Sequence, residues 1–115
     1  MQNILNFLQT ICAAEDIGLY SFPFEHYTGL AVKNSQARAI GYKDTLSGWP
    51  QISTIAHELG HHALGHLDDD VMMLSDKGDI DPARERRERE AQIFAAAFTA
   101  FAMYDHYKEL GGVAT

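Results

Sequence analysis

The stretch His57-Glu58-Leu59-Gly60-His61 determines which fold and which chemistry this chain can adopt. Its two histidines are four residues apart, so on a helix both imidazoles project from one face and can meet a single metal ion. Glu58 directly follows the first histidine, and its carboxylate can reach a metal-bound water without coordinating the metal. The pattern predicts two metal ligands and a general base. The opposing interpretation is a pair of exposed histidines on a helix surface.

The residues around this motif have the periodicity of a helix. From Ile52 to Leu67 the apolar residues recur three or four apart, which marks one buried stripe. We expect the helix to end near Gly65. Residues 43–50 are rich in turn formers and predict the end of a sheet just before the helix.

The remaining segments predict a small α+β domain. We expect a minimal zincin-like fold, with an N-terminal helix, a small, mostly antiparallel sheet of about three strands, the motif helix and a long C-terminal helix. The expected segments are an amphipathic helix at 4–14, an extended stretch at 19–24, a hairpin from 30–33 and 37–42, an acidic, solvent-exposed connection at 68–81 and a helix at 82–104.

Composition limits the function classes. The length of 115 residues and the 46% of hydrophobic residues predict one domain spanning residues 1–115. The net charge of -7 argues against direct nucleic-acid binding. A single cysteine, Cys12, cannot form an internal disulfide, and no apolar run approaches the roughly 18 residues of a membrane span. We therefore expect a soluble, cytoplasmic protein without membrane association.

A catalytic zinc usually has three protein ligands, so the sequence must supply one more. His66 is close in sequence, but five residues beyond His61 it points about 140° away on a continuous helix. His66 would need the helix to break before it could coordinate the same metal. Two alternative roles for His66 are a cap at the end of the helix and an outer partner, a residue that hydrogen-bonds to a metal ligand without touching the metal.

Glu90 is the favoured third ligand. It lies one turn before Phe94 on an expected apolar stripe that continues through Ala97, Phe98 and Phe101. A carboxylate aimed at the core is costly unless it is paired or bound to a metal. The alternatives are an ion pair of Glu90 with Arg86 or Arg87 at the start of the helix, and Glu88 as the ligand.

The motifs together resemble the ImmA/IrrE metallopeptidase family. The resemblance rests on residues 54–61 (TIAHELGH), 64–66 (LGH) and 90–95 (EAQIFA). It departs from the usual family pattern in two places. Gln92 stands where many members carry Asn, and no Leu-Pro pair follows Ala95.

The resemblance implies an intracellular zinc metallopeptidase, often encoded on phages or mobile elements, whose characterised relatives cleave or inactivate helix-turn-helix repressors. It implies that His57 and His61 are zinc ligands, Glu58 the catalytic acid/base and Glu90 the third ligand. Mn²⁺ or Fe²⁺ can also occupy a site with two histidines and one carboxylate. The expected function is that of a regulatory endopeptidase with a specific protein substrate.

Two other functions compete with this interpretation. One is a binding protein that keeps the fold and sequesters a repressor or antitoxin without cutting it. An intact Glu58 disfavours this role, because a pure binder needs no base. The other is a metal-dependent hydrolase that acts on a non-peptide bond.

Overall fold

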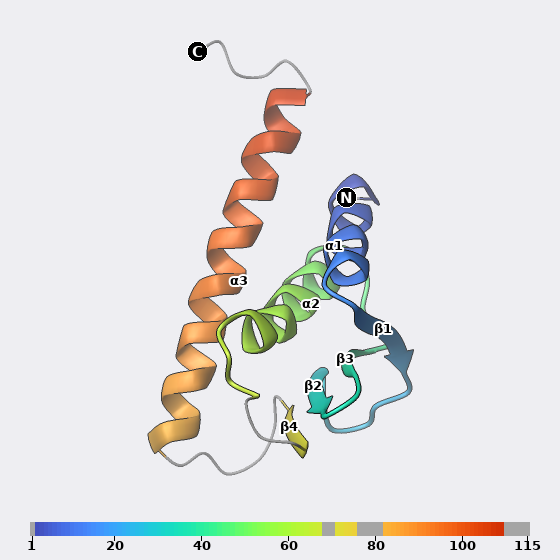
Figure 1. Ribbon diagram of the computed structural model, residues 1–115. Helices are drawn as coiled ribbons and strands as arrows, with labels where there is room; N and C mark the ends of the chain where they lie inside the picture. The colour runs from blue at the N-terminus through green and yellow to red at the C-terminus, as the bar shows by residue number, and fades with distance from the viewer. Residues whose placement is uncertain (1, 68–70, 76–81, 110–115) are drawn as a thin grey trace.

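The computed structural model describes residues 2–67, 71–75 and 82–109 as an α+β fold, which confirms the predicted fold class (Figure 1). Its elements, in chain order, are α1 (Gln2–Ala14), β1 (Ile17–Phe22), β2 (Gly29–Asn34), β3 (Arg38–Lys43), α2 (Gly48–Ala63), β4 (Val71–Ser75) and α3 (Pro82–Glu109). No helix within these ranges is both long and apolar enough to cross a membrane.

The four strands form one mixed, mostly antiparallel sheet in the order β1-β3-β2-β4. Strand β1 runs parallel to β3, whereas β2 is antiparallel to both β3 and β4. The predicted hairpin between β2 and β3 is confirmed. Its turn is closed by Asn34, whose side-chain oxygen accepts hydrogen bonds from the backbone N–H groups of Gln36 and Ala37.

Strand β4 corrects the prediction for the segment between the last two helices. We expected residues 68–81 to be a solvent-exposed connection, but Val71–Ser75 pairs with β2 and adds a fourth strand. The short apolar run at 71–74 is the strand signal, and the acidic residues on both sides obscured it. The rest of the predicted connection lies outside the described residues.

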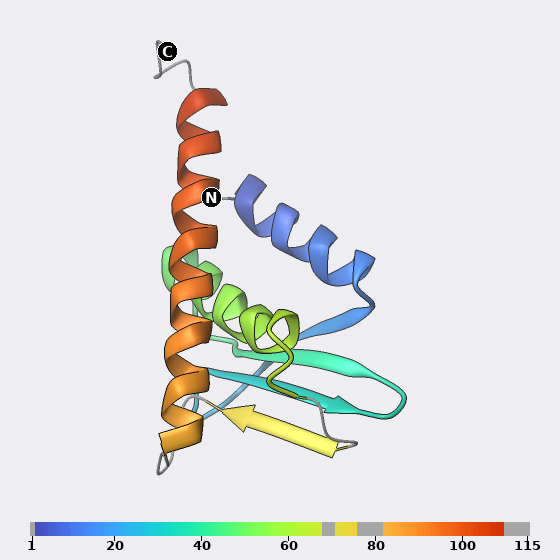
Figure 2. The ribbon, with the colours of Figure 1, turned by 60° about the vertical axis from the view of Figure 1, so that its left-hand side comes forward.

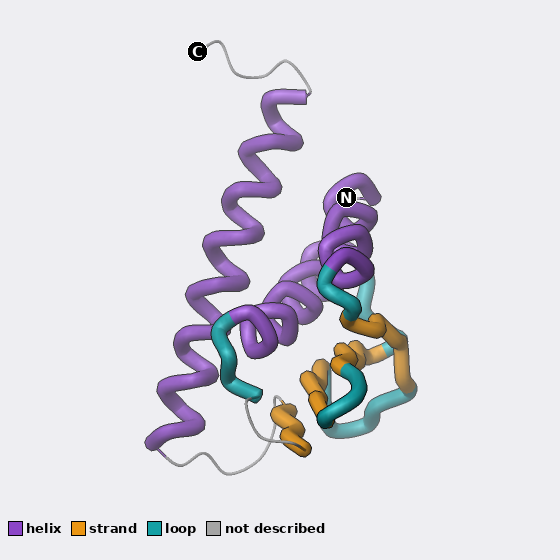
Figure 3. The backbone as a smooth tube through the Cα atoms, in the orientation of Figure 1, coloured by secondary structure: helices purple, strands orange, loops and turns teal. Residues whose placement is uncertain are grey.

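Helices α1 and α2 lie on one face of the sheet, with the motif helix α2 at the centre of the domain, and α3 runs along the side of α2 (Figure 2). Helix α2 packs on β2 and β3, while α1 packs on β1 and α2. Helix α3 crosses α2 and continues well past it (Figure 3). The buried core between these layers contains Ile4, Leu8, Cys12, Ile17, Ile40, Ile52, Ile55, Ala56, Leu59, Ala95 and Ala102.

Helix α3 meets α2 through small side chains. Ala91, Ala95 and Ala102 of α3 are buried. On the α2 side a Cβ atom at Gly60 would lie 3.1 Å from Cδ1 of the Phe94 ring, which shows how closely α3 approaches this glycine. Because the distance between packed helices depends on the side chains at their contact, these small residues bring the two helices close together.

The predicted buried face of α3 was only partly right, since Phe94 and Phe98 pack against the core but the most buried positions lie beside them. We expected a stripe through Glu90, Phe94 and Phe101, but Phe101 is 73% exposed. The fully buried positions of α3 are instead alanines, because the close crossing of α2 leaves little room for a larger side chain. Since successive helical residues are about 100° apart, the alanine face leaves Glu90 to one side. That face turns Glu88, which is three residues before Ala91, toward α2.

Candidate metal centre

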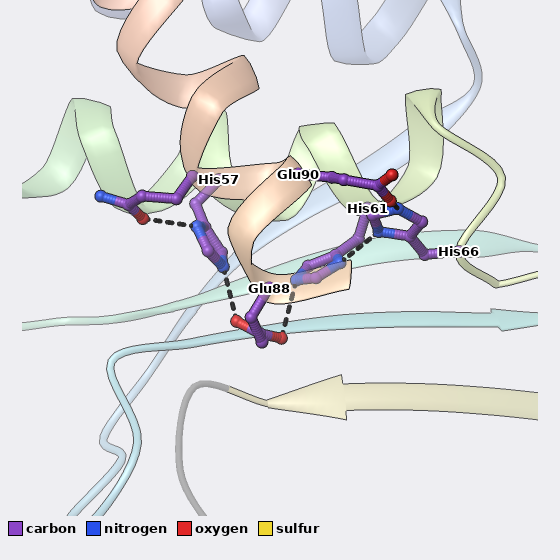
Figure 4. A network of polar contacts seen from close by, with 6 residues as sticks. His57, His61, His66, Glu88 and Glu90 are labelled. Atoms are coloured by element: carbon purple, nitrogen blue, oxygen red, sulfur yellow. Dashed lines mark hydrogen bonds and ion pairs between the residues drawn. The ribbon is translucent and has the colours of Figure 1, made fainter. Parts of the chain in front are cut away.

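Helix α2 carries the motif on a buried surface. His57 is 8% exposed, and Glu58 and His61 are 0% exposed. The helix starts after Ser47, which has extended backbone angles, and it carries Pro50 in its first turn, where a proline costs no helical hydrogen bond. Helical spacing then aims both histidines from α2 toward the first turns of α3 (Figure 4).

Glu88 of α3 lies between the two histidines (Figure 4). Its Oε2 is 2.9 Å from Nε2 of His57, and its Oε1 is 3.1 Å from Nε2 of His61. One donor atom from each of the three residues lies within 4.8 Å of the other two. The two helices therefore bring two imidazole nitrogens and one carboxylate together at a single point.

This group fits a divalent metal ion. Among the described residues, Nε2 of His61 and Oε1 of Glu88 are buried without a hydrogen-bond partner, although they face one another. Buried polar atoms are usually satisfied, and a cation shared between them would satisfy both. Two histidines and one carboxylate are a donor set that suits zinc and also manganese or iron.

The Glu88 carboxyl has an unusually low pKa. Burial alone would raise this pKa, but the adjacent imidazoles of His57 and His61, in their protonated form, stabilise the carboxylate and lower its pKa to about 2. Glu88 is therefore ionised at any physiological pH. An anionic oxygen between two imidazoles is the form that a metal ligand requires.

Gln92 fixes the orientation of His57 from the outside. Its side-chain oxygen lies 3.0 Å from Nδ1 of His57, so the ring donates its Nδ1 proton to the amide. In a neutral His57 the lone pair is then on Nε2, the atom that faces Glu88. Gln92 was assigned no role from the sequence beyond its departure from the family's usual Asn, because contacts between helices cannot be read from one sequence.

Glu58, which follows His57 on α2, is buried and packs against the sheet. A Cβ atom at Gly29 of β2 would lie 2.9 Å from Oε2 of Glu58 and 2.8 Å from Cγ2 of Thr54. The absence of a side chain at Gly29 thus leaves room for the carboxylate. A polar hollow of about 270 Å³ opens next to this region, lined by Ser53, Thr54, His57, Glu88 and Gln92.

The structure does not bring Glu90, the predicted third ligand, into the group with His57 and His61. The Glu90 side chain is 50% exposed, and its carboxylate lies 2.9 Å from Nε2 of His66. The physical reason is the phase of α3, which turns Glu88 inward in its place. His66, left open as a ligand or an outer partner, contacts Nδ1 of His61 and lies outside the group of three.

A further buried histidine, His62, was missed in the sequence. Its Nε2 donates a hydrogen bond of 2.9 Å to the backbone carbonyl of Ala39 in β3. Burial lowers the pKa of His62, which the hydrogen bond to Ala39 partly offsets, so the ring ties α2 to the sheet as a neutral group. The signal was its spacing, since His62 continues the buried row of Ile55 and Leu59.

The fold and the site together define a metallopeptidase-type domain. Residues 12–99 match the peptidase family described as the IrrE N-terminal-like domain, Peptidase_M78. The match covers most of the chain, so the protein belongs to this family and the resemblance seen in the sequence is confirmed. No curated protein matches the chain.

Proposed function

We propose that this protein is a zinc-dependent regulatory endopeptidase that cleaves a specific protein. The observation that carries the proposal is the His57, His61 and Glu88 group on the two crossing helices, with the buried Glu58 next to its first histidine. Membership in a peptidase family supports the same reaction class.

In this proposal His57, His61 and Glu88 hold the metal and Glu58 acts as the general base. A bound zinc ion would polarise the scissile carbonyl and lower the pKa of water from about 15.7 to about 7. The Glu58 carboxylate accepts the proton of the attacking water and later returns it to the leaving amine. Gln92 keeps the His57 ring oriented throughout.

For the substrate we propose a helix-turn-helix repressor in the same cytoplasm, encoded near this protein on a phage or mobile element. The support is the family resemblance, whose characterised members act on such repressors. The net charge of -7 fits a protein that reaches a DNA-bound regulator through protein contacts rather than by gripping DNA itself.

Glu58→Gln separates binding from chemistry. The amide keeps the size of the side chain but cannot take up the proton, so hydrolysis should fall by the roughly 10²- to 10⁴-fold typical of a general base. Metal content and the unfolding midpoint should persist. The assay incubates zinc-loaded protein with candidate repressors encoded nearby, and follows cleavage by mass spectrometry and metal content by elemental analysis.

Glu85→Gln is the matched control, because Glu85 is an exposed carboxylate on α3 that pairs only at the surface with Arg89. It should cleave like the parent protein. Repressor inactivation that is unchanged in Glu58→Gln, with metal still bound, would refute the peptidase and favour sequestration without cleavage.

A further inference from the structure

A line of hydrogen bonds leaves the candidate metal centre on the side away from Glu88. Nδ1 of His61 lies 2.9 Å from Nδ1 of His66, and Nε2 of His66 lies 2.9 Å from Oε1 of Glu90 (Figure 4). The His61 and His66 side chains are 0% and 6% exposed, whereas Glu90 is 50% exposed. The line thus runs from a buried ligand candidate to a carboxylate at the surface.

When His61 binds a metal through Nε2, the chemistry of these groups fixes where the protons lie. An ionised carboxylate only accepts hydrogen bonds, so Nε2 of His66 must carry the proton toward Glu90. In a neutral His66 the other nitrogen, Nδ1, is then an acceptor, and Nδ1 of His61 must be the donor. His61 then has its lone pair on Nε2, as metal binding requires, whereas without metal the Glu88 carboxylate that faces Nε2 favours a proton there.

The backbone places His66 where this line needs it. Helix α2 ends at Ala63, and Gly65 adopts a φ of 72°, which reverses the direction of the chain. The N–H of Gly65 bonds to the carbonyl of His62 at 3.3 Å, and the N–H of His66 bonds to the carbonyl of His61 at 3.0 Å. This is the Schellman arrangement, and it returns His66 to His61 although a continuous helix would turn it away.

We propose that His66 and Glu90 are positioning residues that hold His61 in the tautomer and orientation needed for metal binding. The inference rests on the proposed function, because it takes His61 as a ligand. Neither residue touches the metal in this arrangement. Outer partners of this kind contribute roughly 10- to 100-fold to metal affinity.

Four variants test the proposal by zinc affinity, measured in competition with a chelating dye. His66→Phe keeps the ring volume without an acceptor and should weaken zinc binding by roughly 10- to 100-fold. His66→Asn places an amide oxygen near the position of Nδ1 and should restore most of the affinity. Glu90→Ala should weaken binding in the parent but have no effect in the His66→Asn background, where nothing remains for Glu90 to orient.

A second readout follows the His61 tautomer directly, by ¹⁵N NMR of the metal-free protein at about pH 8.5, where an ordinary histidine is neutral. Because Glu88 attracts a proton to Nε2 and His66 attracts one to Nδ1, the parent and His66→Asn should show a larger population of His61 protonated at Nδ1 than the other two variants. His66→Phe and Glu90→Ala should shift the population toward Nε2. A purely structural role for His66 would change the unfolding midpoint and leave the tautomer of His61 as it is.

The outcomes separate this inference from the proposed function. If the parent protein binds no metal, the proposed function fails, and the NMR measurement still decides whether Glu90 and His66 set the tautomer. If the parent binds zinc and His66→Phe binds it equally tightly with His61 unchanged, the positioning role is refuted while the peptidase stands. Loss of zinc binding in Glu90→Ala that persists in the His66→Asn background would instead make Glu90 a direct ligand.

Discussion

His57 and His61, the two motif histidines of α2, are oriented by different hydrogen-bond partners. His57 donates to the amide oxygen of Gln92, a single step to an exposed side chain. His61 has the buried imidazole of His66 as its hydrogen-bond partner, and His66 in turn hydrogen-bonds to the carboxylate of Glu90. The first side depends on α3 alone, while the second also depends on the turn that ends α2.

The comparison shows how much of the centre is assembled by one helix crossing. Glu88, Glu90 and Gln92 come from the first turns of α3 and reach three different histidines. Glu88 and Gln92 are four residues apart and share a face, so both serve His57. Any change in how α3 packs on α2 would disturb all of these contacts together.

The largest loss of zinc affinity is expected at Glu88, which contacts both His57 and His61. Glu88→Ala removes the carboxylate that both Nε2 atoms face, so zinc affinity should fall by more than the roughly 100-fold upper range of an outer partner. Dye competition measures this loss, with Glu85→Ala as the control on the same helix. Normal binding by Glu88→Ala, together with abolished binding by Glu90→Ala, would return the ligand role to Glu90.

Metal removal tests whether His57, His61 and Glu88 bind one ion together. At a free zinc concentration of 100 times Kd, binding should add about 2.7 kcal/mol to the free energy of unfolding. For a domain of this size that should raise the midpoint by about 10 °C, and a chelator should reverse the rise. The same zinc concentration should leave the midpoint of Glu88→Ala unchanged, and an equal rise in that variant would place the ion elsewhere.

The sequence predicted α2 better than α3 for a physical reason. In α2 the histidine spacing and the aliphatic stripe share one period, so pattern and packing agree. In α3 the buried face consists of alanines, whose hydrophobic signal is weak, while exposed aromatics such as Phe101 gave a stronger but misleading one. The choice of Glu90 over Glu88 followed from that misleading phase.

The outer partners of the site depend on geometry that one sequence does not contain. His66 meets His61 only because Gly65 reverses the chain, although the glycine was a recognisable helix-end signal. Gln92 meets His57 across 35 residues of sequence. The fold class and the motif helix were therefore predictable, whereas the pairing between helices required their crossing to be known.

A smaller loss of zinc affinity is expected when the hydrogen-bond partner of His57 is removed. Gln92→Leu removes the acceptor for Nδ1 of His57, and zinc affinity should fall by about tenfold, the lower end of the outer-partner range. The loss should stay below that of His66→Phe, because water can replace the exposed amide oxygen but has little access to the buried imidazole. Gln92→Glu keeps an acceptor and should bind zinc like the parent. A larger loss in Gln92→Leu than in His66→Phe would reverse the comparison.

The smallest effect concerns the turn that carries His66, and two glycines provide a matched pair to measure it. Gly65 has a φ of 72° and Gly48, at the start of α2, a φ of 61°. Alanine at either position costs roughly 1–2 kcal/mol of unfolding free energy, because its Cβ disfavours left-handed backbone. A Cβ at Gly48 would meet nothing within 4 Å, so Gly48→Ala should lose stability and keep its zinc affinity.

Gly65→Ala should show a similar stability loss and, in addition, bind zinc severalfold more weakly, because relief of the strain displaces His66 from His61. Denaturant titration gives the stability and dye competition the affinity. Equal zinc affinities in the two variants would show that the turn does not support the His61 side.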